Sequence, residues 1–321
     1  MVYTEEQLKR MALPLGDTEN EKCVHTIKAI RDALKNLGYY SVNGDNVGTL
    51  VEGTFSYSIR MKKYATSEDV EIFIQGSYAN NTCVRGESDV DIAVIRHDKY
   101  EYAFGDEFVP YIGGYEHSQE ARTFKTIVLK ALNDAFGPTN VHRHNKSIKV
   151  DGNTYRKQAD VVPAFSIRYF YDSERKNYDY YLEGITIYAD DGEIINNFPK
   201  QHIENGKKKN IDTHYYYKKM VRIIKKIRYQ MEDMQYASAK GVSSFGLESL
   251  LWNVPDGLFM KYGDAYRYTF DDIVDYLYKN KFLLGIYSEA NGIKKLCPRD
   301  DDVKKYSQFI DELHTFYKYE G

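Results

Sequence analysis

Several residue types and patterns are scarce in this 321-residue chain, and each scarcity argues against a class of protein. The three cysteines, Cys23, Cys83 and Cys297, are too widely spaced to indicate a disulfide framework or a zinc knuckle. No apolar run approaches the roughly 18 residues that cross a membrane, and the charged N-terminus lacks a signal-peptide core. We therefore expect a cytoplasmic protein without membrane contact. The formal net charge is only −3, so no global positive field attracts nucleic acid.

The rest of the composition is that of an ordinary globular protein rich in tyrosine. Hydrophobic residues make up 42% and charged residues 28% of the chain, and the length suffices for one large domain or two lobes sharing an active site. There are 31 tyrosines and one tryptophan. Tyrosine has an apolar ring and a polar tip, so it suits core edges as well as clefts in which bases stack. The composition agrees with a nucleotide-binding cleft without requiring one.

Apolar patterns predict strands in the first part of the chain and helices in the last. Helices are expected at about 18–37 and 119–136. Strands are expected at 70–75, 88–95, 145–150, 154–162, 181–188 and 193–197, with Asp151-Gly152 and Asp190-Asp191-Gly192 as hairpin turns. The polar run at 205–210 is expected to be a break between lobes. Beyond it, helices are expected at 213–236, 244–252, 271–280 and 302–319.

Two aspartates flank Val90 on one of these strands. Because side chains alternate along a strand, Asp89 and Asp91 point to one face and Val90 points to the other. Two carboxylates on one strand face repel each other unless a cation lies between them. Mg²⁺ suits such a pair, since it takes oxygen ligands and shares them with phosphates. Taken alone, an Asp-x-Asp pair is more often a solvated strand end.

Gly76-Ser77, directly after the preceding strand, changes that balance. Glycine allows close approach of the backbone, and exposed N–H groups with the serine hydroxyl can hold phosphate. By itself the pair would be read as a plain turn. Residues 78–88 then lead to Asp89, so a phosphate holder and a metal holder lie on neighbouring strands. The combination predicts a site for a nucleoside triphosphate and a divalent metal.

Gln75-Gly76-Ser77 and Ser88-Asp89-Val90-Asp91-Ile92 resemble the signature of the polymerase-β-like nucleotidyltransferase superfamily. The resemblance implies an α+β fold, in which a mixed sheet with helices forms the core and a helical lobe follows. It also implies a third carboxylate on a later strand, and Asp160 in QADVVPAF fits that role. The alternative for Asp160 is a buried aspartate that needs hydrogen-bond partners in the core.

Later blocks narrow the resemblance to the bacterial CD-NTase family, relatives of cyclic GMP-AMP synthase and oligoadenylate synthetase that make second messengers in antiphage defence (CBASS). The blocks fall in order between about residues 20 and 260: QGSYANNTCVRGESDVDIAVI, YRKQADVVPAF, NNFPKQHIENGKKKN, YYKKMVRIIKKIR and SSFGLESLLWNVP. The resemblance implies a core lobe with an N-terminal spine helix at 1–205. It implies a helical lobe at 206–321 that closes the active-site cleft.

The predicted helix at 213–236 is amphipathic, with an apolar face of Met220, Ile223, Ile224, Ile227, Met231 and Met234. Lys218, Arg222 and Lys225 lie on the opposite stripe, which the resemblance implies meets triphosphate; a solvated face is the alternative. The resemblance also places Ser244 near the donor nucleotide, although an N-cap role explains this serine equally well. Phe245 beside it offers a surface on which a base can stack.

The resemblance implies template-independent nucleotidyl transfer, in which a hydroxyl attacks the α-phosphate of a triphosphate and pyrophosphate leaves. Nucleoside triphosphates such as ATP and GTP would be donor and acceptor. Two Mg²⁺ ions, or Mn²⁺, would be held by Asp89, Asp91 and Asp160, while Gly76 and Ser77 hold the outer phosphates. The expected product is a cyclic oligonucleotide, most simply a dinucleotide, which reaches an effector; a regulatory protein is a further expected partner. The bases, ring size and linkage stay open.

Two other interpretations also stay open. The chain could be a superfamily enzyme that adds nucleotides to RNA, protein or a small molecule, although macromolecular acceptors favour a broad basic surface. It could instead be a catalytically dead nucleotide-binding sensor. Such a sensor would have no need for three converging carboxylates.

Overall fold

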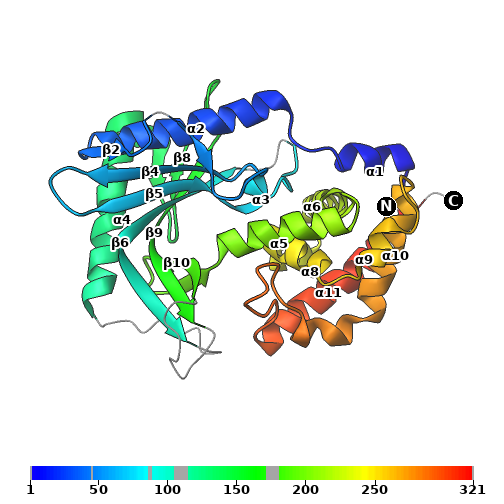
Figure 1. Cartoon of the computed structure of the whole chain (residues 1–321). Coiled ribbons are helices and arrows are strands. Elements are labelled where there is room, and N and C mark those ends of the chain that lie inside the picture. The colour runs from blue at the N-terminus through cyan, green and yellow to red at the C-terminus, as the bar shows by residue number, and fades with distance from the viewer. Residues whose placement is uncertain (1, 45, 86–88, 105–114, 171–180, 320–321) are drawn as a thin grey trace. The chain divides into compact units, whose positions relative to one another are not determined.

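The structure is a computed structural model that describes residues 2–44, 46–85, 89–104, 115–170 and 181–319, and Figure 1 shows its helices and strands. Contacts divide the chain into two compact units. The sheet unit comprises Gly16–Ala79 and Asp89–Lys200, and the helical unit comprises Met1–Leu15, Asn80–Ser88 and Gln201–Gly321. The sequence predicted a different division, into a core lobe at 1–205 and a helical lobe at 206–321 that closes the active-site cleft. That division stays a prediction.

A mixed sheet is the centre of the sheet unit. Its described strands are β2 (Tyr39–Ser41), β3 (Gly48–Thr49), β4 (Tyr57–Lys63), β5 (Asp69–Ile74), β6 (Val90–Phe104), β7 (Val141–Arg143), β8 (Ile148–Val150), β9 (Ala159–Phe170), β10 (Leu182–Tyr188) and β11 (Ile194–Asn197). The main order is β11-β10-β9-β6-β5-β4-β2, with β3 paired to β4 and β8 paired to both β9 and β7. Within this sheet β6 and β9 run parallel, and the other described pairs are antiparallel. The mixed sheet with its helices confirms the α+β prediction.

Two long helices, α2 (Asp17–Lys35) and α4 (Tyr115–Phe136), lie against one face of this sheet (Figure 1). Val90, Ile92 and Val94 alternate along β6 and are almost fully buried. On the same face of β6, the Arg96 guanidinium lies 5.7 Å from the ring of Phe124 on α4. Over residues 90–97, the opposite face of the sheet therefore carries the odd-numbered residues of β6, and Asp91 is one of them. The short helices α3 (Gly76–Ala79) and η1 (Pro138–Asn140) complete this unit.

The helical unit packs around α6. Its described elements are α1 (Glu5–Met11), α5 (Pro199–Asp212), α6 (Tyr217–Asp233), α7 (Ala237–Gly241), α8 (Ser244–Trp252), α9 (Asp256–Met260), α10 (Tyr266–Lys279), η2 (Lys281–Ile286), α11 (Asp300–Phe316), and the parallel strands β1 (Val2–Tyr3) and β12 (Lys318–Tyr319). The predicted apolar face of α6 is fully buried from Met220 to Met231. The prediction that Met234 belongs to this face is wrong. The helix ends at Asp233, and the side chain of Met234 beyond it is 53% exposed.

The predicted break at 205–210 and the predicted two-residue turn at 151–152 are wrong. The polar run at 205–210 lies inside α5, which begins at the end of the sheet unit and continues into the helical unit. Gly206 is a packing residue there, since an added Cβ would lie 3.1 Å from Oδ1 of Asn80. Residues 145–150 and 154–162 do contain the paired strands β8 and β9, but residues 151–158 connect them instead of a two-residue turn. The β10–β11 hairpin is confirmed.

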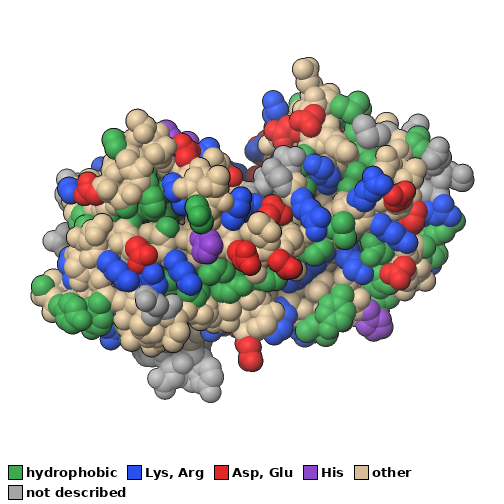
Figure 2. All heavy atoms as spheres, turned by 90° about the horizontal axis from the view of Figure 1, so that it is seen from above, with side chains coloured by type: hydrophobic (Ala, Val, Ile, Leu, Met, Phe, Trp, Pro, Cys, Tyr) green, Lys and Arg blue, Asp and Glu red, His purple; other side chains and the backbone are tan. Residues whose placement is uncertain are grey.

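No helix among the described residues is both long and apolar enough to cross a membrane. On the face that Figure 2 shows, Lys and Arg side chains are interspersed with Asp and Glu side chains. A mixture of this kind produces no field of a single sign on that face.

Candidate functional site

Two of the three predicted catalytic carboxylates lie side by side in the sheet unit. Asp91 on β6 and Asp160 on β9 are register partners of the parallel strand pair. Adjacent strands are about 4.8 Å apart, and register partners project from the same face, so the two side chains emerge together. Both are partly buried, and Ser147 Oγ donates a hydrogen bond of 3.3 Å to Oδ1 of Asp160. Asp160 is thus partly buried and has a hydrogen-bond partner, so its role as a metal ligand stays a prediction, as does the alternative of a hydrogen-bonded aspartate of the core.

Gly76 lies against this pair. The backbone of Gln75 donates to the Asp91 carbonyl oxygen at 2.9 Å, which brings the end of β5 beside the start of β6. Gly76 has φ +67°, and an added Cβ would overlap Oδ2 of Asp91 and lie 3.2 Å from its Cγ. Both the backbone conformation and the space therefore require glycine. Ser77 follows in α3, so the predicted phosphate-holding pair adjoins Asp91, one of the predicted metal ligands.

Asp89 differs from the other two carboxylates. It precedes β6, its side chain is exposed, and its Oδ2 accepts a 2.6 Å hydrogen bond from Nε2 of Gln158. Over the described ranges, no three His, Cys, Asp or Glu side chains come close enough together to hold a metal ion. The structure thus pairs Asp91 with Asp160 and leaves Asp89 on Gln158. Ser88, the first residue of the predicted motif, lies outside the described residues.

Two predicted phosphate-binding residues of the helical unit are buried and already paired. Lys225 is 1% exposed and forms an ion pair with Glu248, which also accepts hydrogen bonds from Thr82 and His202. Burial alone would raise the pKa of Glu248, but the charge of Lys225 and the His202 contact hold this pKa well below its usual range. Arg222 is 5% exposed, and its guanidinium donates to main-chain oxygens, including that of Ala12 at 2.6 Å.

These contacts mean that Arg222 and Lys225 stabilise the helical unit, and we do not propose them as triphosphate ligands. A helical wheel cannot show that the stripe opposite the apolar face is also covered. In this unit the segment Asn80–Arg85 covers it: Arg222 donates to the carbonyl of Asn81, and Lys225 to that of Thr82 at 3.2 Å. A buried charge without a partner would be costly, so each cation is matched there.

Lys218, Ser244 and Phe245 are better placed for a ligand. Lys218 is partly buried, and within the described residues its ammonium has no hydrogen-bond or ion-pair partner. Burial, aided by the charges of Arg222 and Lys207, lowers the pKa of Lys218 to about 8 against the opposing charge of Glu248. Ser243, not Ser244, is the N-cap of α8, with its hydroxyl accepting from the Gly246 N–H. Ser244 is therefore not needed as the cap, and Phe245 is 36% exposed.

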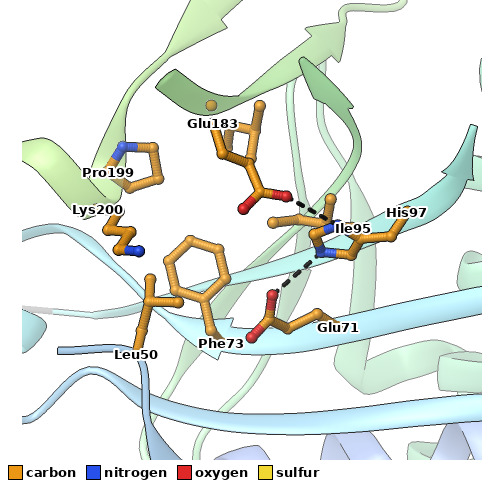
Figure 3. Close-up of a pocket in the computed structure, with 10 residues that line it drawn as sticks. Leu50, Glu71, Phe73, Ile95, His97, Glu183, Pro199 and Lys200 are labelled. Atoms are coloured by element: carbon orange, nitrogen blue, oxygen red, sulfur yellow. Dashed lines mark hydrogen bonds and ion pairs between the residues drawn. The ribbon is translucent and has the colours of Figure 1, made fainter. Parts of the chain in front are cut away.

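A charged pocket that the sequence did not reveal lies farther along the face that carries Asp91 (Figure 3). His97, six residues beyond Asp91 on β6, lies between the carboxylates of Glu71 at 3.1 Å and Glu183 at 3.2 Å. Burial alone would lower the pKa of His97, but hydrogen bonds to both carboxylates raise it above its ordinary value. Alternation along β6 could have placed His97 on this face. Its partners on β5 and β10 follow only from strand register.

The sheet, the registered carboxylates and the Gly-Ser turn together define a polymerase-β-like nucleotidyltransferase. The model of the cGAS/DncV-like nucleotidyltransferase C-terminal helical domain matches residues 204–318. The cyclic GMP-AMP synthase CdnE03 of Staphylococcus schleiferi is 40% identical over 100% of this chain and 98% of its own length. The chain therefore belongs to the CD-NTase family of cGAS/DncV-like nucleotidyltransferases.

Solved structures agree with this assignment. The Elizabethkingia meningoseptica CdnE cyclic dinucleotide synthase, solved with GTP and Apcpp, is 31% identical, with a TM-score of 0.69 over 97% of this chain and 99% of that one. The Rhodothermus marinus CdnE c-UMP-AMP synthase, solved with Apcpp and Upnpp, is 27% identical, with a TM-score of 0.72 over 98% and 97%. The family resemblance stated from the motifs is confirmed.

Proposed function

We propose that this protein joins nucleoside triphosphates, without a template, into a cyclic dinucleotide that acts as a second messenger in antiphage defence. The observation that carries the proposal is the register of Asp91 with Asp160 beside Gly76. Full-length similarity to a cyclic GMP-AMP synthase supports the cyclic product. The R. marinus relative is named for UMP and AMP, so family membership leaves the bases of this product open. We place the protein in the cytoplasm with its substrates, effector and any regulatory protein.

The residues fit a divalent cation such as Mg²⁺ or Mn²⁺. Asp91 and Asp160 present carboxylate oxygens from adjacent strands, and two such charges repel unless a cation or proton is shared. Both would hold metal, with Asp89 as a further ligand. When bound, two ions would neutralise charge on the α-phosphate and make the attacking hydroxyl more acidic. Other ligand positions would be taken by phosphate oxygens and water, as is usual for Mg²⁺.

The chain's own groups supply binding and orientation. Gly76 lets the backbone and the Asp91 carboxylate lie close together, and Ser77 offers a hydroxyl for the outer phosphates. The sheet fixes both carboxylates at a rigid strand pair, so little reorganisation accompanies the reaction. Lys218 supplies a cation for phosphate, while Ser244 and Phe245 bind sugar or base. Positioning and charge neutralisation are the main contributions expected in phosphoryl-type transfer.

The direct test is the identity of the product. Incubation of the purified chain with all four triphosphates and Mg²⁺ should release pyrophosphate and yield a phosphatase-resistant compound. Ring closure leaves no terminal phosphate, so mass spectrometry should find the mass of two nucleoside monophosphates less two waters. Omission of one triphosphate at a time would identify the two bases.

The Asp91→Asn protein serves as the control and should give neither signal. A phosphatase-sensitive ladder of linear oligomers would refute cyclisation but not nucleotidyl transfer. Strict dependence on added RNA would favour an RNA-adding enzyme. Nucleotide binding without any pyrophosphate release, over a range of Mg²⁺ and Mn²⁺ concentrations, would favour the sensor interpretation.

Triphosphate affinity should depend on pH through Lys218. Phosphate binds the charged ammonium, and the pKa near 8 means that the free protein loses this charge as pH rises through that value. Affinity should therefore be full below pH 7 and fall about tenfold from pH 7 to pH 9, since one pKa unit corresponds to a factor of ten. Titration calorimetry with a non-hydrolysable triphosphate at fixed Mg²⁺ measures this.

Two variants separate Lys218 from other causes. Lys218→Arg keeps its charge throughout, so its affinity should stay flat across the range. Lys219→Gln is the matched control, since Lys219 lies over the rings of Tyr216 and Tyr266, and it should keep the wild-type pH dependence. An unchanged pH dependence in Lys218→Arg would show that this lysine does not contact phosphate.

A further inference from the structure

The connection between β8 and β9, residues 151–158, is a compact loop. An added Cβ at Gly152 would lie 2.7 Å from the backbone nitrogen of Gln158, so the two ends of the loop meet and only glycine fits. The Asn153 side chain accepts hydrogen bonds from the backbone N–H groups of Tyr155 at 2.8 Å and Arg156 at 2.9 Å. Arg156 also donates to the carbonyl of Asp151 at 2.8 Å. We call residues 151–158 the brace loop.

Helix α2 holds the far end of the brace loop. The backbone N–H of Lys157 donates to Oγ1 of Thr26 at 3.0 Å, and Thr26 is completely buried. The Lys157 ammonium lies 3.4 Å from Oε1 of Glu19, also on α2. These contacts fix the backbone immediately before Gln158. Because Lys157 is held in place, the backbone position from which the Gln158 side chain extends is also fixed.

Gln158 uses that position to contact the segment of Asp89 twice. Its carbonyl oxygen accepts from the Val90 N–H at 3.0 Å, and its Nε2 donates to Oδ2 of Asp89 at 2.6 Å. Gln158 also directly precedes β9 and lies two residues before Asp160. It therefore joins the two segments that together carry the three predicted metal ligands, Asp89 and Asp91 on one and Asp160 on the other.

We propose that Gln158 is a positioning residue that orients the Asp89 carboxylate for metal binding. Asp89 is exposed and precedes the strand, so its side chain would otherwise rotate freely. The amide holds Oδ2 and leaves Oδ1 with its lone pairs for a cation. A neutral amide does this without adding a positive charge that would oppose the metal, whereas the neighbouring Lys157 points its charge to Glu19. This inference rests on the proposed function of the three aspartates.

The test is Mn²⁺ binding, measured by titration calorimetry on the nucleotide-free protein. Gln158→Met keeps the length of the side chain and removes the donor. Loss of a hydrogen bond to a metal ligand typically weakens metal binding 10- to 100-fold, so the Kd for Mn²⁺ should rise at least about tenfold. The Mg²⁺ concentration for half-maximal product formation should rise by a similar factor, while the rate at saturating Mg²⁺ stays within about threefold.

Two further proteins make the result specific. Gln119→Met, at an exposed position on α4, should bind Mn²⁺ like the wild type. In an Asp89→Asn background, Gln158→Met should produce no further change in Kd, because the residue it orients is already altered. Unchanged Mn²⁺ binding in Gln158→Met, or an equal loss in the Asp89→Asn background, would overturn the inference. Wild-type protein that forms no product would contradict the proposed function separately, whatever the Mn²⁺ results.

Discussion

Replacement of Asp91 or Asp160 by asparagine is expected to reduce product formation by a factor on the order of 10³ or more. Each change removes one of two carboxylates that are register partners on β6 and β9. Loss of one charge weakens the negative potential that attracts the metal, and transition-state charge then goes largely uncompensated. Pyrophosphate release at saturating triphosphate and Mg²⁺ measures the effect.

The fold should survive these changes. Without metal, Asp91 and Asp160 repel each other, so either variant should melt at the wild-type temperature or slightly above it. The increase in melting temperature that Mg²⁺ produces in the wild type should disappear. Asp134→Asn is the matched control, because it removes only an exposed i,i+4 pair with Lys130 and should leave both readouts unchanged. More than about a tenth of wild-type turnover in Asp91→Asn would exclude its role as a metal ligand.

Gly76→Ala is expected to reduce turnover by about 10²-fold or more, approaching the loss of Asp91 itself. The new Cβ would overlap Oδ2 of Asp91, so the carboxylate would have to rotate from its position beside the register partner Asp160. By contrast, Ser77→Ala removes one neutral hydrogen bond, which contributes about 0.5–1.5 kcal/mol, and should cost at most about tenfold. Single-turnover rates and Mn²⁺ affinity would compare the two.

Gly192 provides the control for backbone strain. It also has a positive φ, +94°, but an added Cβ there meets nothing within 4 Å. Alanine at either position pays about 1–2 kcal/mol for the left-handed conformation. Gly192→Ala should therefore lose stability without losing activity or metal affinity. If Gly76→Ala behaved in the same way, the contact with Asp91 would not matter for catalysis.

Local patterns predicted most of the elements that position the site. The alternation around Val90, the β-branched run at 70–75 and the periodic helices near the ends of the chain depend on neighbours in sequence, which a pattern reports directly. The predicted break at 205–210 is wrong for the same reason. The polar run that contains Gly206 has the composition of a helix break. The structure shows instead that Gly206 packs against Asn80, which lies more than a hundred residues earlier in the chain.

Lys225 shows where local patterns stop being informative. A helical wheel places Lys225 opposite the apolar face of α6. The wheel does not show whether a cation at that position is exposed or buried. Its ion pair with Glu248 and its contact with the carbonyl of Thr82 come from segments 23 and 143 residues away. Lys218, the second residue of the same helix, has no such partner for its ammonium among the described residues, and only the folded unit distinguishes the two lysines.

The sequence by itself determined which chemistry to expect of this protein: two aspartates that flank Val90, a Gly-Ser pair before them, and a family resemblance that the full-length similarity confirmed. The tertiary structure alone decided which groups meet. It set Asp91 against Asp160 across a parallel strand pair, gave Asp89 to Gln158, and matched Lys225 with Glu248. The physical reason is that residue type and spacing fix what a side chain can do, whereas register and burial depend on contacts between distant segments.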